Sequence, residues 1–246
     1  MKKGFCIYLF CLFVAFNTIA QTKKSSVATK TKTANTLSAD KKIAKETNIA
    51  FATSERLVQI ETKYGSLVAK LYNATPLHRD NFLKLVTDGF YDSLLFHRII
   101  NQFMIQGGDP VSKNANAEIM LGNGSAPGDR IPAEMNKIFY HKKGALAAAR
   151  DNNPQKASSN CQFYLVQGKV QTDEDLAKVQ NSGVPYSAAQ VEIYKRVGGA
   201  PFLDQNYTVF GEVISGLEVI DKIASLGTGA NNRPTENITM KIKLLN

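Results

Sequence analysis

Cysteine is scarce in this chain of 246 residues, which holds only three. Cys6 and Cys11 both lie within the first dozen residues, so Cys161 is the only cysteine in the rest of the chain. That remainder therefore has no internal disulfide framework. A zinc site built on paired cysteines is excluded there for the same reason.

The hydrophobic run at the N-terminus is too short to span a bilayer. It covers residues 5–16, about 12 residues, whereas a spanning helix needs about 20. Two lysines precede it, and Asn-Thr-Ile-Ala at 17–20 follows it, with small residues at the positions expected of a cleavage site, which is typical of a secretory signal peptide. We predict a signal peptide over residues 1–20, cut after Ala20, with an uncleaved membrane anchor as the alternative. Lipidation is not expected, because Cys11 lies inside the run rather than after its end.

The basic charge of the chain is concentrated in its first part. The net charge is +9. Residues 1–52 hold nine lysines and two acidic residues, a net charge of +7, whereas residues 53–246 hold 21 basic and 19 acidic residues, a net charge of +2. A nucleic-acid-binding core would carry its basic patch on the folded domain, so that class is disfavoured. Residues 21–52 have few large apolar side chains, which predicts a flexible basic linker.

Residues 53–246 are expected to form one domain of mostly β structure. Alternation of apolar and polar side chains over 56–61 and again over 66–71, with a turn at 63–65, predicts a hairpin with one buried face. Many strands and few helices indicate a barrel or a sandwich. Further strands are expected at 95–100, 103–106, 144–149, 162–167, 208–213 and 238–244.

Two helices interrupt this β pattern. Thr75 is expected to cap a helix that starts at Pro76, a residue favoured at the first helical position. Gly89 is expected to stop it. A second helix is expected at 216–224, where apolar residues recur at helical spacing.

Residues 168–201 are predicted to form a helical pair inserted between two strands. The first helix opens with a capping box at 172–175, and the second lies at 188–197. We expect this insertion to border the binding groove. Residues 110–143 have weak periodicity and are expected to form a long functional loop.

The stretch 96–109 reads FHRIINQFMIQGGD and resembles the signature of cyclophilins, which are peptidyl-prolyl cis/trans isomerases. Three later blocks agree with that family in the same order: GALAAA at 144–149, SNCQFY at 159–164, and FLD at 202–204 followed by VFG at 209–211. The resemblance covers about residues 53–246, apart from the insertion. It implies an eight-stranded antiparallel β-barrel closed by two α-helices, with the helical pair inserted.

The reaction of that family needs no chemical reagent from the protein. Rotation about an amide costs about 18–20 kcal/mol, and X-Pro bonds exchange over tens of seconds or longer. No bond is made or broken, so no nucleophile, metal or cofactor is expected. The catalyst has to hold the proline and favour a twisted amide, and each ~1.4 kcal/mol of that preference is a factor of ten in rate.

The resemblance implies two catalytic residues and a set of substrate-binding residues. Arg98 matches the arginine that hydrogen-bonds the substrate near the proline, and its guanidinium is a permanent donor. Gln106 matches the glutamine that contacts the peptide backbone. His97 is expected to be structural, because amide rotation needs no proton transfer. The implied substrate-binding residues are Phe103, Met104, Tyr164 and Leu203 in the proline pocket, Ala149 and Arg150 at the edge that pairs with the peptide, and Gln162, Phe202 and Tyr207.

Four of these residues depart from the family's common pattern. Phe202 stands where many members have tryptophan, so weak cyclosporin sensitivity is expected. Tyr164 replaces a common phenylalanine and places a hydroxyl at the pocket wall, where it is expected to reach water. Tyr207 replaces a histidine at the pocket edge, and Arg150 replaces an asparagine, which adds a charge to the peptide-pairing edge.

The leading hypothesis is an exported isomerase that assists the folding of exported proteins, in the periplasm or after secretion. Expected partners are proline-containing peptides and unfolded or nascent exported proteins, with no nucleic acid and no stable membrane insertion once the signal is cut. The protein is expected to be a monomer.

Two other classes of function remain as alternatives. The first is a non-catalytic proline-peptide binding module or chaperone on the same barrel. A retired enzyme commonly loses the arginine, whereas Arg98, Phe103, Met104 and Gln106 are all present here. The second is a surface-adhesion or scaffold role, which rests on residues 21–52 alone.

Overall fold

A computed structural model describes residues 55–245 of the chain. The expected signal peptide, 1–20, and linker, 21–52, lie outside the described residues, so both stay predictions, as does the start of the domain at residue 53. Among the described residues, no helix is long and apolar enough to cross a membrane.

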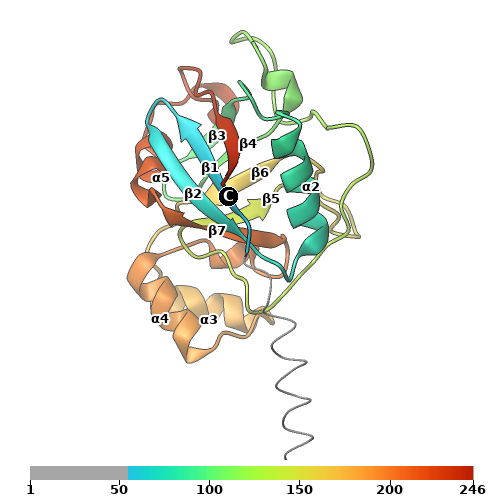
Figure 1. Ribbon diagram of the computed structural model, residues 1–246. Helices are drawn as coiled ribbons and strands as arrows, with labels where there is room; N and C mark the ends of the chain where they lie inside the picture. Colours follow the sequence, from blue (N-terminus) through green and yellow to red (C-terminus); the bar gives the residue numbers. More distant parts are fainter. Residues whose placement is uncertain (1–54, 246) are drawn as a thin grey trace, which may run out of the picture. The chain divides into compact units, whose positions relative to one another are not determined.

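Eight antiparallel strands form a single curved sheet in the order β3-β4-β6-β5-β7-β2-β1-β8 (Figure 1). Its two edge strands meet just before each begins, where Leu95 bridges Thr239 and the amide of Phe96 donates to the carbonyl of Ile238. The sheet therefore curls back on itself, as the expected barrel requires. The strands are β1 (Leu57–Thr62), β2 (Gly65–Leu71), β3 (Phe96–Ile100), β4 (Met104–Gly107), β5 (Ala145–Ala148), β6 (Phe163–Val166), β7 (Val209–Ser215) and β8 (Lys241–Leu245).

The expected strands are all present, and their ends differ from the expectation by at most three residues. The largest difference is in the last strand, which begins at Lys241 instead of Ile238. Residues 238–240 continue the apolar pattern, but they bond the chain just before β3, whereas β8 pairs with β1. The periodicity of apolar residues predicts a strand, but it does not show which segment that strand pairs with.

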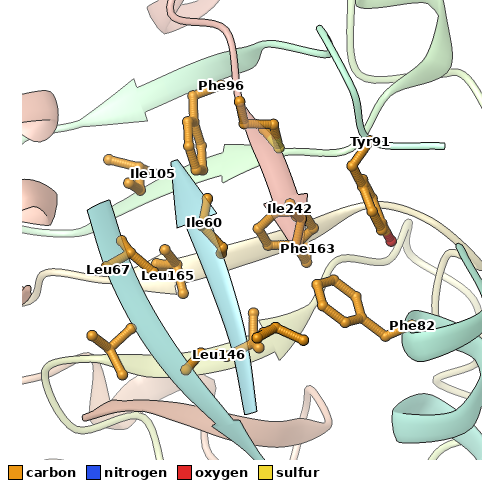
Figure 2. Close-up of a cluster of buried hydrophobic side chains, with 14 of the residues drawn as sticks. Ile60, Leu67, Phe82, Tyr91, Phe96, Ile105, Leu146, Phe163, Leu165 and Ile242 are labelled. Carbon is orange, nitrogen blue, oxygen red and sulfur yellow. The ribbon is translucent and has the colours of Figure 1, made fainter. Parts of the chain in front are cut away.

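The hydrophobic core lies inside the curled sheet (Figure 2). α2 (Pro76–Thr87) packs against β7 and β8, and α5 (Leu217–Ala224) packs against β2, β3 and β4, so two helices cover the barrel as implied. Phe82 of α2 meets Phe163 of β6 edge to face, with ring centroids 5.4 Å apart. Aliphatic residues from the strands fill the rest of the interior: Ile60, Leu67, Ile105, Leu146, Leu165 and Ile242.

A distant glutamate, rather than Thr75, caps the first turn of α2. Thr75 occupies the N-cap position, but its hydroxyl bonds a carbonyl of the preceding turn and no helix amide. The carboxylate of Glu134 accepts hydrogen bonds from the backbone amides of Leu77 and His78 at 3.0 and 2.9 Å, and from Nδ1 of His78 at 2.7 Å. Thr75 therefore holds the N-cap position as expected, but its side chain does not cap the helix, because a long loop supplies the capping group.

The two helices expected in the insertion are present between β6 and β7 (Figure 1). α3 (Asp173–Asn181) and α4 (Ala188–Val197) each begin with a capping box, at Thr172 and at Ser187. We call α3, α4 and their connection the hairpin. Leu176 and Tyr194 are its buried side chains, and the Tyr194 ring packs edge to face against the rings of Tyr140 and Tyr186.

Residues 110–143 form the expected long loop, anchored on the barrel by a buried carboxylate. Asp109 is fully buried and accepts hydrogen bonds from the backbone amides of Val111 and Gly122. The loop thereby lies close to the ends of β3 and β4. Short 3-10 helices lie at Pro110–Ser112 (η1), Pro201–Leu203 (η2) and Ala230–Asn232 (η3).

Two buried histidines have lowered pKa values. Burial lowers the pKa of His97 to about 4, and neither ring nitrogen has a hydrogen-bond partner among the described residues. Burial also lowers the pKa of His78, against the opposing effect of Glu134. A histidine in the unfolded chain has a pKa near 6.5. As the pH falls, each of these histidines therefore gains its proton at a higher pH in the unfolded state than in the folded state, which favours unfolding.

We expect Glu134→Ala to lower the free energy of unfolding by about 1–2 kcal/mol, because the first turn of α2 loses its cap. Thr75→Val should cost less, since the Thr75 hydroxyl bonds no helix amide. Urea denaturation measures both, and Glu118→Ala, at an exposed position, is the control. A larger loss for Thr75→Val than for Glu134→Ala would contradict the assignment of the cap.

Stability should fall as the pH drops from 6.5 to 4, with neutral His97 accounting for about 3 kcal/mol of the loss. The folded-state pKa is the lower one, so this stability is present above pH 6.5 and is lost on acidification. Denaturation of wild type and His97→Leu across this range measures it. The same pH dependence in both proteins would rule out His97 as the cause.

Candidate functional site

Strand register places four side chains in one row across the sheet. Arg98 of β3 lies opposite Gln106 of β4, which lies opposite Tyr164 of β6, which lies opposite Ala147 of β5. Residues directly opposed in antiparallel strands point to the same face. Met104, two residues before Gln106, shares that face. The register therefore gathers a cation, an amide and apolar side chains on one side of the sheet.

A cavity of about 100 Å³ opens on this face. Met104, Tyr164 and Leu203 form a buried apolar wall, each no more than 8% exposed. Arg98 lies at its polar side. Nine of the residues implied by the sequence line this cavity, which we call the central cavity: Arg98, Phe103, Met104, Gln106, Ala149, Arg150, Tyr164, Leu203 and Tyr207.

The two other implied residues, Gln162 and Phe202, border the central cavity without lining it. Oε1 of Gln162 accepts a hydrogen bond from Nε2 of Gln106 at 3.1 Å. Phe202 is 60% exposed, and its ring centroid lies 5.4 Å from that of Phe103. Gln162 thus supports a lining residue from behind, whereas Phe202 extends the apolar surface outward.

A chain of amide hydrogen bonds fixes Arg98. Nη1 of Arg98 donates to Oε1 of Gln106 at 3.2 Å, and Gln106 donates in turn to Gln162. Nε2 of Gln162 donates to the backbone carbonyls of Gly122 and Gly124 at 2.9 and 2.8 Å. Burial lowers the pKa of Arg98, but an arginine stays charged. No further hydrogen bond of its guanidinium reaches an acceptor in residues 55–245, so N–H donors remain available at the cavity.

Arg150 and Tyr207 form the rim. The guanidinium of Arg150 lies 4.7 Å from the centroid of the Tyr207 ring, a cation–π arrangement. Its Nε donates to the carbonyl of Asn206 at 2.8 Å. The positive charge expected at this edge is therefore held in place at the mouth of the central cavity.

The edge available for pairing with a peptide is narrower than the resemblance implies. The amide of Ala149 donates to the carbonyl of Gln162 at 2.9 Å, and its carbonyl accepts from the amide of Ser159 at 2.8 Å. The backbone groups of Arg150 have no such bond within the described part of the chain. Peptide pairing, still a prediction, is left to Arg150.

Two larger hollows adjoin the central cavity, and Gln106 lines all three. One, of about 500 Å³, lies between His97, residues 117–123 and residues 230–233. The other, of about 320 Å³, lies beside Arg130. An extended chain seated in the central cavity has room to continue into an adjoining hollow. No group of three or more His, Cys, Asp or Glu side chains in residues 55–245 is placed to hold a metal ion.

The structure adds residues that the sequence did not indicate. The Tyr164 hydroxyl was expected to reach water, which was wrong: it is buried, 3.0 Å from Nε2 of His141. Nδ1 of His141 lies 2.7 Å from Asp204, to which Tyr186 and Tyr194 of the hairpin also bond. Asp204 belongs to the FLD block. His141, Tyr186 and Tyr194 lie outside every block that resembles the family, so the sequence did not single them out.

Comparisons with known proteins agree on one family. The family model for cyclophilin type peptidyl-prolyl cis-trans isomerase/CLD matches residues 57–243. A Staphylococcus epidermidis protein named as a peptidyl-prolyl cis-trans isomerase is 33% identical to this chain over 189 residues. The match covers 76% of this chain and 90% of that protein. A Staphylococcus aureus protein of the same name is 32% identical over 185 residues, or 75% of this chain and 88% of that protein.

Solved structures agree with the fold. A cyclophilin type peptidyl-prolyl cis-trans isomerase from Cryptosporidium parvum has a TM-score of 0.59 at 24% identity, covering 78% of this chain and 98% of that one. Its structure in the presence of the dipeptide Ala-Pro has a TM-score of 0.57 at 25% identity. With the model match spanning most of the chain, and relatives matched along most of their own length, this chain belongs to the cyclophilin-type peptidyl-prolyl cis-trans isomerase family.

Proposed function

We propose that this isomerase seats the proline ring of an extended peptide in the central cavity and that Arg98 favours the twisted X-Pro amide. The observation that carries the proposal is a charged donor with unused N–H groups beside a small cavity that has an apolar wall. Met104, Phe103 and Leu203 supply apolar contact for the ring. The remaining peptide runs into the adjoining hollows.

Arg98 acts on the state in which amide resonance is lost. As the amide twists, its nitrogen becomes pyramidal and gains a lone pair that can accept a hydrogen bond. A guanidinium donor interacts more strongly with that lone pair than with the planar amide, so it lowers the barrier of about 18–20 kcal/mol. Partial burial strengthens the interaction, because it lowers the local dielectric.

Gln106 serves both Arg98 and the peptide in this mechanism. Its oxygen accepts from Arg98 and its nitrogen donates to Gln162, so the guanidinium cannot swing away from the cavity. A side-chain amide has two acceptor positions and two N–H donors. One of each is therefore left for the peptide backbone, beside the backbone groups of Arg150.

Arg98→Ala should lower kcat/KM for a short X-Pro peptide by roughly a hundredfold, the loss typical of one donor to a transition state. Arg98→Lys should recover little of it, because an ammonium does not reproduce the guanidinium geometry. Exchange NMR of the peptide measures the rate, and Arg196→Ala, an exposed arginine on α4, is the control.

Full activity in a folded Arg98→Ala protein would overturn the role of Arg98. A wild-type protein that broadens the peptide signals without accelerating exchange would favour the alternative, a binding module or chaperone that does not catalyse. Both results come from the same spectra, so the experiment separates the two classes of function.

The proposed setting is outside the cytoplasm, where the enzyme assists the folding of exported proteins whose X-Pro bonds isomerise slowly. The support is the sequence of residues 1–20, with two lysines, a short apolar run and the small residues Thr18 and Ala20 near the cleavage point. The basic linker, 21–52, then separates the cleavage point from the folded domain.

Expression of the full chain in a bacterium should yield a mature protein that begins at Gln21, as N-terminal sequencing would read. Ala20→Phe should leave the precursor uncut, because the cleavage site needs a small residue. A matched Ala28→Phe change in the linker should not affect processing. Recovery of wild type with Met1 intact in the membrane fraction would support the uncleaved anchor instead.

A further inference from the structure

Asp204 is a buried carboxylate surrounded by hydrogen-bond donors from two parts of the chain. It is 2% exposed and directly follows Leu203, a wall residue of the central cavity. Oδ1 accepts from the backbone amide and from Nδ1 of His141, at 2.8 and 2.7 Å. Oδ2 accepts from the hydroxyls of Tyr186 and Tyr194 of the hairpin, at 2.7 and 2.6 Å.

The positions of the protons in this cluster follow from its chemistry. Burial, with the nearby Asp204 charge, raises the pKa of Tyr186 and of Tyr194 far above the usual value, so both hydroxyls stay protonated and donate. The carboxylate only accepts, so Nδ1 of His141 carries the proton between them. In the neutral ring the other nitrogen, Nε2, is then an acceptor, 3.0 Å from the Tyr164 hydroxyl.

Nε2 of His141, as an acceptor, determines the direction in which the Tyr164 hydroxyl donates its hydrogen bond. The Tyr164 ring lines the central cavity, whereas His141 does not line it and is fully buried. Burial raises the pKa of Tyr164 well above its usual value, so its hydroxyl also stays protonated. A buried hydroxyl without a partner costs free energy. With Nε2 as its partner behind the wall, Tyr164 presents only its ring to the proline.

We propose that Tyr186 and Tyr194 are positioning residues of the proline pocket, acting through Asp204 and His141 on the direction of the Tyr164 hydroxyl. The inference rests on the proposed function of the central cavity. It assigns the hairpin a role in binding short peptides, in addition to any contact with larger clients. Tyr186 strengthens the link, because its hydroxyl also lies 3.1 Å from the carbonyl of Pro201 in η2.

Removing one hairpin hydroxyl should disturb the cavity wall without touching it. In Tyr194→Phe, Oδ2 of Asp204 loses its shortest hydrogen bond and keeps only the one from Tyr186, so the carboxylate is held less firmly. Oδ1, the acceptor of Nδ1 of His141, belongs to the same carboxylate and is then less fixed, so the imidazole gains access to the other tautomer, in which Nε2 carries the proton. Nε2 then donates to the Tyr164 hydroxyl, whose own hydrogen has to turn away from His141. The cavity wall becomes less suited to an apolar ring as a result.

The test is a double-mutant cycle between Tyr194→Phe and Tyr164→Phe. We expect Tyr194→Phe to raise KM for a short X-Pro peptide about threefold at unchanged kcat, within the range of coupling for residues in one network. In the Tyr164→Phe background it should have no further effect, because no hydroxyl is left to orient. Tyr140→Phe is the control: its ring centroid lies 5.3 Å from that of Tyr194, but its hydroxyl makes no hydrogen bond within residues 55–245.

Side-chain ¹⁵N NMR of the three histidines reports their tautomers and provides a second readout. If Tyr194 only stabilised the fold, Tyr194→Phe would not change the tautomer of His141. His141 should be the Nδ1–H tautomer in wild type and in Tyr140→Phe, and a mixture in Tyr194→Phe. An equal rise in KM in both backgrounds, or a tautomer unchanged by Tyr194→Phe, would overturn the inference. A wild-type protein without isomerase activity would overturn the proposed function instead, and the NMR spectra, which need no substrate, would still decide this inference.

Discussion

The pairing of β3, β4 and β6 is the constraint on which the site depends. Side chains alternate between the two faces of a strand, so a shift of one residue would move Arg98 or Gln106 to the opposite face. The glycines that end β4 help to fix this register. A side chain at Gly108 would collide with the carbonyl of Cys161, in the segment that leads into β6, and φ there is +93°. The backbone thus brings the guanidinium, the amide and the apolar wall together.

Local signals in the sequence were sufficient for the strands and the helices, and the family resemblance named the residues that line the central cavity. The alternation at 57–71, the two capping boxes and the fourteen-residue motif each depend on neighbours in the chain. The errors concern contacts between distant segments. Glu134 replaces Thr75 as the cap of α2, and His141 replaces water as the partner of Tyr164. A single sequence gives no signal for such pairs, because no period or spacing relates them.

The buried carboxylate of Asp204 connects the inserted hairpin to the central cavity. A buried carboxylate needs several donors to offset its lost hydration. Here the long loop, 110–143, supplies His141 and the hairpin supplies two tyrosines, so both contribute donors to Asp204. The same carboxylate lies next to Leu203, and its histidine contacts Tyr164, both of which line the central cavity. The hairpin is thereby part of the support of the site, although none of its residues lines it.

The location of a bound proline tests the account most directly. Intermolecular NOEs between a ¹³C-labelled proline peptide and the methyl groups of the protein would give it. The account predicts contacts from the proline ring to the methyl groups of Met104 and Leu203, at the wall of the central cavity. Contacts to Ile119 and Met120 of the larger hollow, with none to Met104, would contradict it.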